Sequence, residues 1–104
     1  MTIKIAESRA ELDFDQRQVV RVKAGDKWVS VALVGDRLFA FADKCPHAGG
    51  CLSAGWINPL GNIVCPIHRY TFDVTNGRNT SGEGYYLKRW PIEETEDGIF
   101  LILS

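Results

Sequence analysis

Apolar and polar side chains alternate with a period of two in several short segments of this chain. The clearest case is 28–34, WVSVALV, in which every second residue is Val or Leu. This alternation is typical of a half-buried β-strand. Segments of similar character lie at 2–5, 18–22, 37–42, 62–65, 70–74, 85–92 and 99–103, with a shorter one around Trp56. The pattern predicts an all-β fold.

Turn signals separate these segments and suggest how they pair. Gly35-Asp36 predicts a tight hairpin between 28–34 and 37–42. Asp97-Gly98 predicts a closing hairpin between 85–92 and 99–103. The polar stretch 6–16 is expected to hold a turn or a short helical piece. Both ends of the chain are therefore expected to contribute to a common base sheet.

Length and charge narrow the class of protein. The chain has 104 residues, enough for one domain, which we expect to span 1–104. Twelve basic and thirteen acidic residues leave it close to neutral, and no basic stripe suggests nucleic acid. No apolar run approaches the length of a membrane span, and the first residues lack the apolar core of a signal peptide. We therefore expect a cytoplasmic protein with neither a nucleic-acid nor a membrane partner.

Two metal-ligand pairs stand out from this β pattern. Cys45 and His47 form the first, and Cys65 and His68 form the second, with seventeen residues between the pairs. A proline follows each cysteine and stiffens the turn. A thiolate and an imidazole this close in sequence can both reach one metal centre. Each pair is mixed, whereas the common zinc pattern places two Cys on one arm and two His on the other.

The two pairs and their surroundings, Cys-Pro-His-Ala-Gly-Gly and Cys-Pro-x-His, resemble the Rieske family of iron–sulfur proteins. In that family two Cys hold one iron of a 2Fe-2S cluster and two His hold the other. The resemblance implies one such cluster, bound by Cys45, His47, Cys65 and His68. It also implies the Rieske fold, an antiparallel β base domain with an inserted cluster-binding subdomain at about 44–70.

The mixed ligand set has an electrostatic consequence. Two thiolates and two neutral imidazoles leave the oxidised cluster close to neutral, whereas four thiolates would leave it negative. An electron is added more easily to a neutral centre, so the reduction potential rises above that of clusters with four Cys ligands. In the family the His edge is where a partner docks, which here implicates Pro46, His47, Ile67 and His68.

Two further residues bear on the potential. High-potential Rieske proteins place a Ser hydroxyl two residues after the second His and a Tyr hydroxyl four residues after it. This chain has Tyr70 and Phe72 at those positions. The missing donors predict a potential near about −150 mV rather than +300 mV, the low end of the Rieske range.

The third cysteine, Cys51, has no place in the ligand pattern. Respiratory-type Rieske proteins carry an extra Cys in each loop, and a disulfide joins them. Ile67 stands where the second of these would lie. The resemblance therefore predicts that Cys51 carries a free thiol; the sequence does not assign it a role.

Three functions are compatible with these residues. The first is a soluble ferredoxin that carries one electron from an NAD(P)H-dependent flavin reductase to a terminal oxygenase. The second is the small ferredoxin-like subunit of an assimilatory nitrite reductase, with the large subunit as its partner. The third is a zinc-binding interaction module. The sequence contains no second set of two His and a carboxylate for a mononuclear iron, so we expect an electron-transfer protein without a catalytic site.

Overall fold

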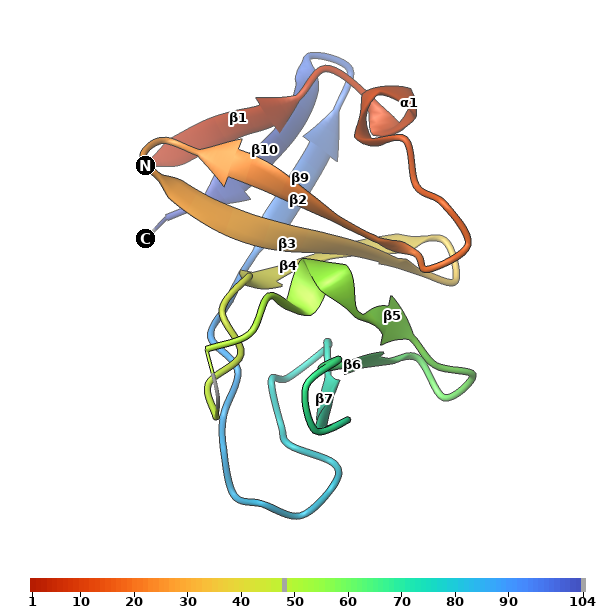
Figure 1. Cartoon of the computed structure of the whole chain (residues 1–104). Helices are drawn as coiled ribbons and strands as arrows, with labels where there is room; N and C mark the ends of the chain where they lie inside the picture. Colours follow the sequence, from red (N-terminus) through yellow and green to blue (C-terminus); the bar gives the residue numbers. More distant parts are fainter. Residues whose placement is uncertain (48, 104) are drawn as a thin grey trace.

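The computed structural model describes residues 1–47 and 49–103, and within them it has ten strands and two short helices (Figure 1). The elements are β1 (Thr2–Ala6), α1 (Arg9–Leu12), β2 (Val19–Ala24), β3 (Lys27–Val34), β4 (Arg37–Ala42), η1 (Leu52–Ala54), β5 (Trp56–Ile57), β6 (Asn62–Val64), β7 (Thr71–Asp73), β8 (Arg89–Trp90), β9 (Ile92–Thr95) and β10 (Gly98–Ile102). The strands form three antiparallel sheets, which confirms the predicted all-β fold.

Two of the sheets form what we call the base. Their strand orders are β1-β10-β9 and β2-β3-β4-β8. Strand β1 pairs with β10, with Thr2 opposite Ile102, so both ends of the chain meet in one sheet as predicted. Figure 1 shows this sheet at one end of the molecule and β2, β3 and β4 below it.

The alternation along β3 explains how the layers are held together. Val29 and Val31 are fully buried and lie in core clusters with Leu101 and Ile99 of β10. Ala32 lies on the opposite face of β3, in another core cluster with Ile63 of β6 and Phe72 of β7. Burying each Val or Leu side chain is worth ~1.5–3 kcal/mol, so β3 stabilises both layers.

The closing hairpin differs from the predicted one. Strand β9 pairs with β10, whereas Arg89 and Trp90 form a separate strand, β8, that pairs with β4. Pro91 lies between them and has no backbone N–H to donate to a ladder. The predicted segment 85–92 is therefore split, and its second half passes from one base sheet to the other.

The third sheet, β5-β6-β7, belongs to residues 43–88, which we call the ligand unit. Figure 1 shows this unit below β4, at the far end from β1 and β10. Its core residues Leu52, Ile63 and Phe72 are fully buried against Val19 and Phe41 of the base. The sheet continues to Asp73, three residues beyond the expected boundary at about 70.

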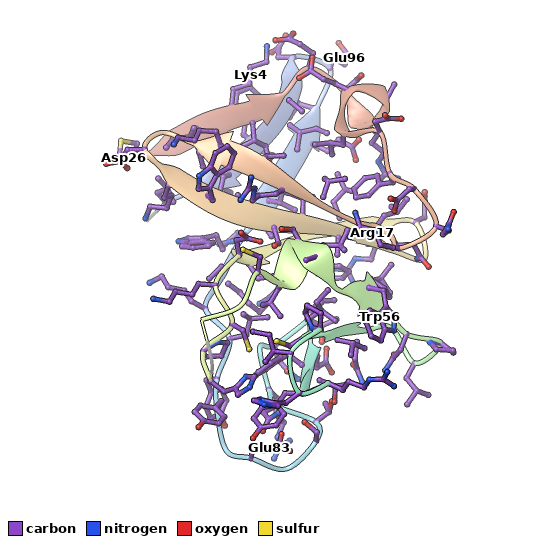
Figure 2. All side chains as sticks on the ribbon, in the orientation of Figure 1. Lys4, Arg17, Asp26, Trp56, Glu83 and Glu96 are labelled. Carbon is purple, nitrogen blue, oxygen red and sulfur yellow. The ribbon has the colours of Figure 1, made fainter. Side chains whose placement is uncertain are left out.

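Hydrogen bonds also join the ligand unit to the loop before β2. Arg17, in the loop before β2, donates from Nη1 to the carbonyl oxygen of Ser53, 2.8 Å away (Figure 2). The Ile57 N–H of the ligand unit donates to the Arg17 carbonyl at 2.9 Å.

Nowhere in residues 1–47 and 49–103 is there a helix with the length and apolar character that crossing a bilayer requires.

Candidate metal centre

The two cysteine–histidine pairs lie at the tips of two similar hairpins. In the first, the Cys45 N–H donates to the Gly50 carbonyl at 2.7 Å. In the second, the Cys65 N–H donates to the Tyr70 carbonyl at 2.8 Å. Each cysteine carbonyl also accepts a hydrogen bond from the residue four positions later, Gly49 or Arg69. We call residues 43–52 the first ligand hairpin and residues 63–72 the second.

The residue four positions after each ligand cysteine lies in a tight turn with an unusual backbone conformation. Gly49 has φ +70° and Arg69 has φ +61°, so both adopt the left-handed conformation. Glycine adopts it without steric cost, whereas arginine does so with some strain. Both hairpins therefore use the same backbone turn, which directs the thiol of the first residue inward.

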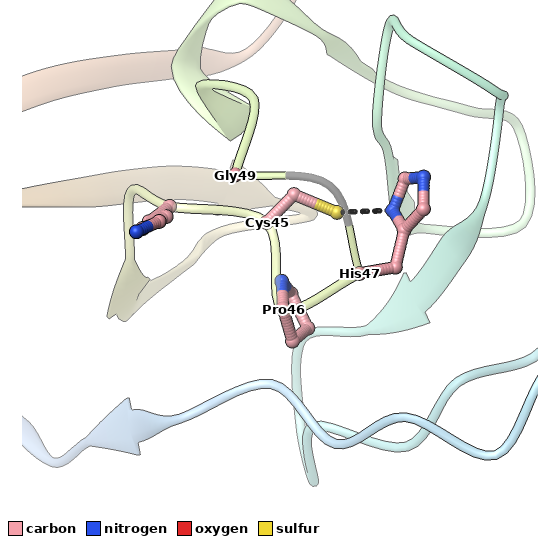
Figure 3. Close-up of a pocket in the computed structure, with 5 residues that line it drawn as sticks. Cys45, Pro46, His47 and Gly49 are labelled. Atoms are coloured by element: carbon pink, nitrogen blue, oxygen red, sulfur yellow. Dashed lines mark hydrogen bonds between the residues drawn. The ribbon is translucent and has the colours of Figure 1, made fainter.

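The four residues singled out from the sequence lie together. The Cys45 Sγ atom is 2.8 Å from Nδ1 of His47, as Figure 3 shows. His47 Nε2 is 3.0 Å from His68 Nδ1. The Cys45 and Cys65 thiols and a His47 ring nitrogen all lie within 4.8 Å of one another. The tertiary fold therefore brings the two sequence pairs to one place.

Burial divides the four side chains by chemical type. Cys45 is 1% exposed and Cys65 is fully buried. His47 is half-buried and His68 is exposed. Two thiols inside and two imidazoles outside fit a two-iron cluster with Cys on one iron and His on the other. The donor set thus suits the group that the sequence resemblance implies.

An aromatic group covers the imidazoles. The Tyr70 ring stacks on His47 with 3.8 Å between centroids and an interplanar angle of 29°. The Tyr85 ring lies 5.9 Å from His47 and 6.0 Å from Tyr70. The sequence did not identify Tyr85 as part of the site, because it was expected to begin the strand 85–92 of the closing hairpin. Tyr85 thus lies beside the Tyr70–His47 stack.

Asn79 anchors the loop that carries Tyr85, and sequence reasoning missed it as well. Its Nδ2 donates to the Thr71 carbonyl and to Ser81 Oγ, each at 3.0 Å. Its Oδ1 accepts from the Gly84 N–H at 2.9 Å. A hydrogen bond from Ser81 is the main reason why the pKa of Glu83 lies below its ordinary value. Figure 2 shows Glu83 at the tip of the ligand unit, at the other end of the molecule from Lys4 and Glu96 of the base.

Asp43, two residues before Cys45, is also absent from the sequence prediction. Its side chain is buried, and Oδ1 accepts from Ser30 Oγ at 2.9 Å and from the Ser53 N–H at 3.1 Å. Burial opposes the charged form, yet hydrogen bonds from Ser53, Ser30 and the Cys51 thiol together bring the pKa of Asp43 below its ordinary value. The carboxylate is thus held as an acceptor beneath the first ligand hairpin.

The exposed residues beside the ligand residues in the chain are of mixed character. Ile67 is 48% exposed, and Pro46 and Arg69 are also at the surface. Cys51 is exposed and carries a free thiol, as predicted. It pairs with Lys44 across the first hairpin.

Comparisons with known proteins show which family this chain belongs to. The model of the Rieske [2Fe-2S] domain matches residues 4–86, which include both ligand hairpins. The chain is 34% identical over 65 residues to the anthranilate 1,2-dioxygenase ferredoxin subunit of Burkholderia cepacia, with 62% of this chain and 59% of the relative covered. It is 31% identical over 85 residues to the nitrite reductase [NAD(P)H] of Emericella nidulans, with 74% of this chain and 8% of the relative covered. The chain thus spans less than two thirds of either relative.

A solved structure extends the similarity to nearly the whole chain. It is the complex of reduced oxygenase and oxidized ferredoxin in carbazole 1,9a-dioxygenase. A chain of that complex superposes with a TM-score of 0.80 and 27% identity, with 96% of this chain and 91% of that chain covered.

Proposed function

Because this chain belongs to the Rieske [2Fe-2S] domain family, we propose that it is a soluble ferredoxin. It takes one electron from an NAD(P)H-dependent flavin reductase and passes it to a terminal oxygenase. The observation that carries this proposal is the division of the four donors, with both thiols buried, His47 half-buried and His68 exposed. The similarity to a dioxygenase ferredoxin subunit supports the choice of partners.

In this proposal Cys45 and Cys65 bind one iron, and His47 and His68 bind the other. The 2Fe-2S cluster, when bound, supplies one-electron chemistry at a potential above that of clusters with four Cys ligands. The burial of the thiols shields them from oxidation, and the stacking of Tyr70 on His47 restrains that imidazole.

The chain's own residues also set where a partner approaches. The exposed His68 ring, with Pro46 and Ile67 beside it, offers a small apolar surface around a polar imidazole edge. An electron-transfer partner needs close approach at this edge and a short-lived contact. Small interfaces of this kind are typical of redox encounters.

The remaining properties follow from the same proposal. We take residues 1–104 as a single domain, because β1 and β10 join the two ends of the chain in one sheet. The exposed, unbridged thiol of Cys51 suits a reducing compartment, so we place the protein in the cytoplasm. Its role is electron transfer rather than catalysis.

The match to nitrite reductase favours a second candidate function. In that case the chain serves as a ferredoxin-like small subunit, and its acceptor is the large subunit of an assimilatory nitrite reductase. A zinc-binding interaction module is the third candidate, since two Cys and two His also suit tetrahedral zinc.

Metal and sulfide analysis separates the zinc candidate from the other two. We expect two irons and two acid-labile sulfides per chain in anaerobically purified protein, with an electron paramagnetic resonance signal only after reduction. Stoichiometric zinc without sulfide, in protein reconstituted with both metals available, would overturn the cluster assignment.

Stopped-flow mixing then separates the two electron-transfer candidates. Reduced protein is mixed with a ring-hydroxylating oxygenase or with a nitrite reductase large subunit, and cluster reoxidation is followed by absorbance. Faster reoxidation by the oxygenase supports the first candidate, and faster reoxidation by the reductase subunit supports the second.

A further inference from the structure

The two ligand hairpins differ in the residue pair at their base. In the second hairpin, Ile63 pairs with Phe72, and both side chains are fully buried and apolar. In the first, the Leu52 N–H donates to the Asp43 carbonyl at 2.7 Å, and Leu52 is fully buried. Asp43 therefore occupies the place that an isoleucine occupies in the matching hairpin.

The Asp43 carboxylate is buried together with one other polar side chain. Within residues 1–47 and 49–103, Ser30 and Asp43 are the buried polar or charged residues, with 0% and 6% exposure. Ser30 lies in the middle of β3, opposite Phe41 of β4. Its hydroxyl donates to Asp43 Oδ1, so the carboxylate reaches from the ligand unit to the base.

The same oxygen also binds the far side of the hairpin. The Ser53 N–H, in η1, donates to Asp43 Oδ1 at 3.1 Å. One carboxylate therefore joins three elements: the end of β4, strand β3 and helix η1. At the matching position of the second hairpin, the Ile63 side chain instead packs in the apolar core.

Burying a carboxylate costs free energy unless its oxygens are hydrogen-bonded. The second hairpin shows that closing this turn needs no charge. We propose that Asp43 is a positioning residue that fixes the first ligand hairpin to the base through Ser30 and to helix η1 through Ser53. It thereby sets where Cys45 and His47 stand relative to the second ligand pair.

This inference rests on the proposed cluster, so its first test uses the metal-loaded protein as purified, whichever metal the hairpins hold. Hydrogen exchange of the Ser53 and Leu52 amides measures the attachment itself. We expect faster exchange at both amides in Asp43→Leu and Ser30→Ala than in the wild type. Ile63→Leu, at the matching position of the second hairpin, is the control and should leave these two amides unchanged.

The iron-loaded protein supplies the second readout, the rate of iron release to a chelator. We expect Asp43→Leu to release iron at least several-fold faster, and Ser30→Ala to fall between it and the wild type. Asp43→Asn should restore most of the retention, because the amide Oδ1 can accept the hydrogen bonds from Ser30 and the Ser53 N–H, although an amide has fewer acceptor sites than the carboxylate for the Cys51 thiol. Its midpoint potential should rise, since a negative charge near Cys45 is removed, whereas Ser30→Ala should leave the potential close to that of the wild type.

The outcomes separate this inference from the proposed function. If the wild type binds zinc and no sulfide, the proposed function fails, and the amide exchange still decides the attachment. Wild-type exchange and wild-type iron release in both Asp43→Leu and Ser30→Ala would overturn the positioning role. If Asp43→Leu does not fold, Ser30→Ala and Asp43→Asn decide it by the same two measurements.

Discussion

The two ligand hairpins share one backbone design and differ in where the histidine falls. His47 is two residues after its cysteine, and His68 is three residues after its own. The hydrogen bonds from the Cys45 and Cys65 amides nevertheless reach the equivalent residues, Gly50 and Tyr70. This comparison indicates that the shared backbone turn determines where the two thiols lie. The histidine spacing and the neighbouring side chains then place the imidazoles.

The largest expected effect tests the equivalence of the two cysteines. Cys45→Ser and Cys65→Ser should each abolish cluster binding, because a hydroxyl is a poor replacement for a thiolate ligand. Both hairpins should then lose order, since metal binding and folding of the site are coupled. Iron and sulfide content, with amide exchange in the hairpins, measures both effects. Cys51→Ser is the matched control and should keep the cluster; retention in either ligand variant would contradict the assignment.

A smaller effect is expected where the hairpins touch. A Cβ atom added at Gly50 would lie 2.3 Å from Ile67 Cδ1, whereas the matching position in the second hairpin holds Tyr70. Gly50→Ala should therefore speed iron release to a chelator moderately, because the exposed Ile67 side chain can move aside in part. The double variant Gly50→Ala/Ile67→Ala should restore the wild-type rate. A double variant no better than Gly50→Ala would show that the two hairpins do not press on each other here.

The third prediction concerns the residues seven positions after each cysteine, Leu52 and Phe72. Both are fully buried in the core that contains the two ligand cysteines. Phe72→Tyr should keep the cluster and raise its midpoint potential if the new hydroxyl donates to the Cys65 sulfur. The wild type is expected near about −150 mV, and protein-film voltammetry at neutral pH measures both proteins. A wild-type midpoint well above zero would contradict the low-potential assignment.

The smallest effect compares the two left-handed residues. Gly49→Ala should lower the free energy of unfolding by ~1 kcal/mol, because it places a Cβ atom at φ +70°. Arg69→Gly should change it by less than about 1 kcal/mol, since the relief of strain and the added freedom of the unfolded chain oppose each other. Thermal unfolding of the iron-loaded proteins measures both. A larger loss in Arg69→Gly than in Gly49→Ala would indicate that the Arg69 side chain itself stabilises the second hairpin.

The fold could be predicted from the sequence wherever a local pattern was strong. The alternation in 28–34 and the turn at Gly35 gave β3 and its partner β4 within a residue. The segment 85–92 was predicted to form one strand, but the structure divides it between two sheets at Pro91. Periodicity reports that a segment is extended; it does not report which of two neighbouring strands it will pair with.

The sequence by itself determined which Cys and His residues are the candidate donors, because their chemistry and short spacing are local properties. It also determined that the chain is built of strands, since a period of two needs no knowledge of distant residues. Only the tertiary structure decided that the thiols are buried while His47 is half-buried and His68 exposed, and that Tyr70 stacks on His47. Only the tertiary structure joined Asp43 to Ser30 across two strands. Burial and such long-range hydrogen bonds depend on how the ligand unit packs on the base, which no single segment of the chain encodes.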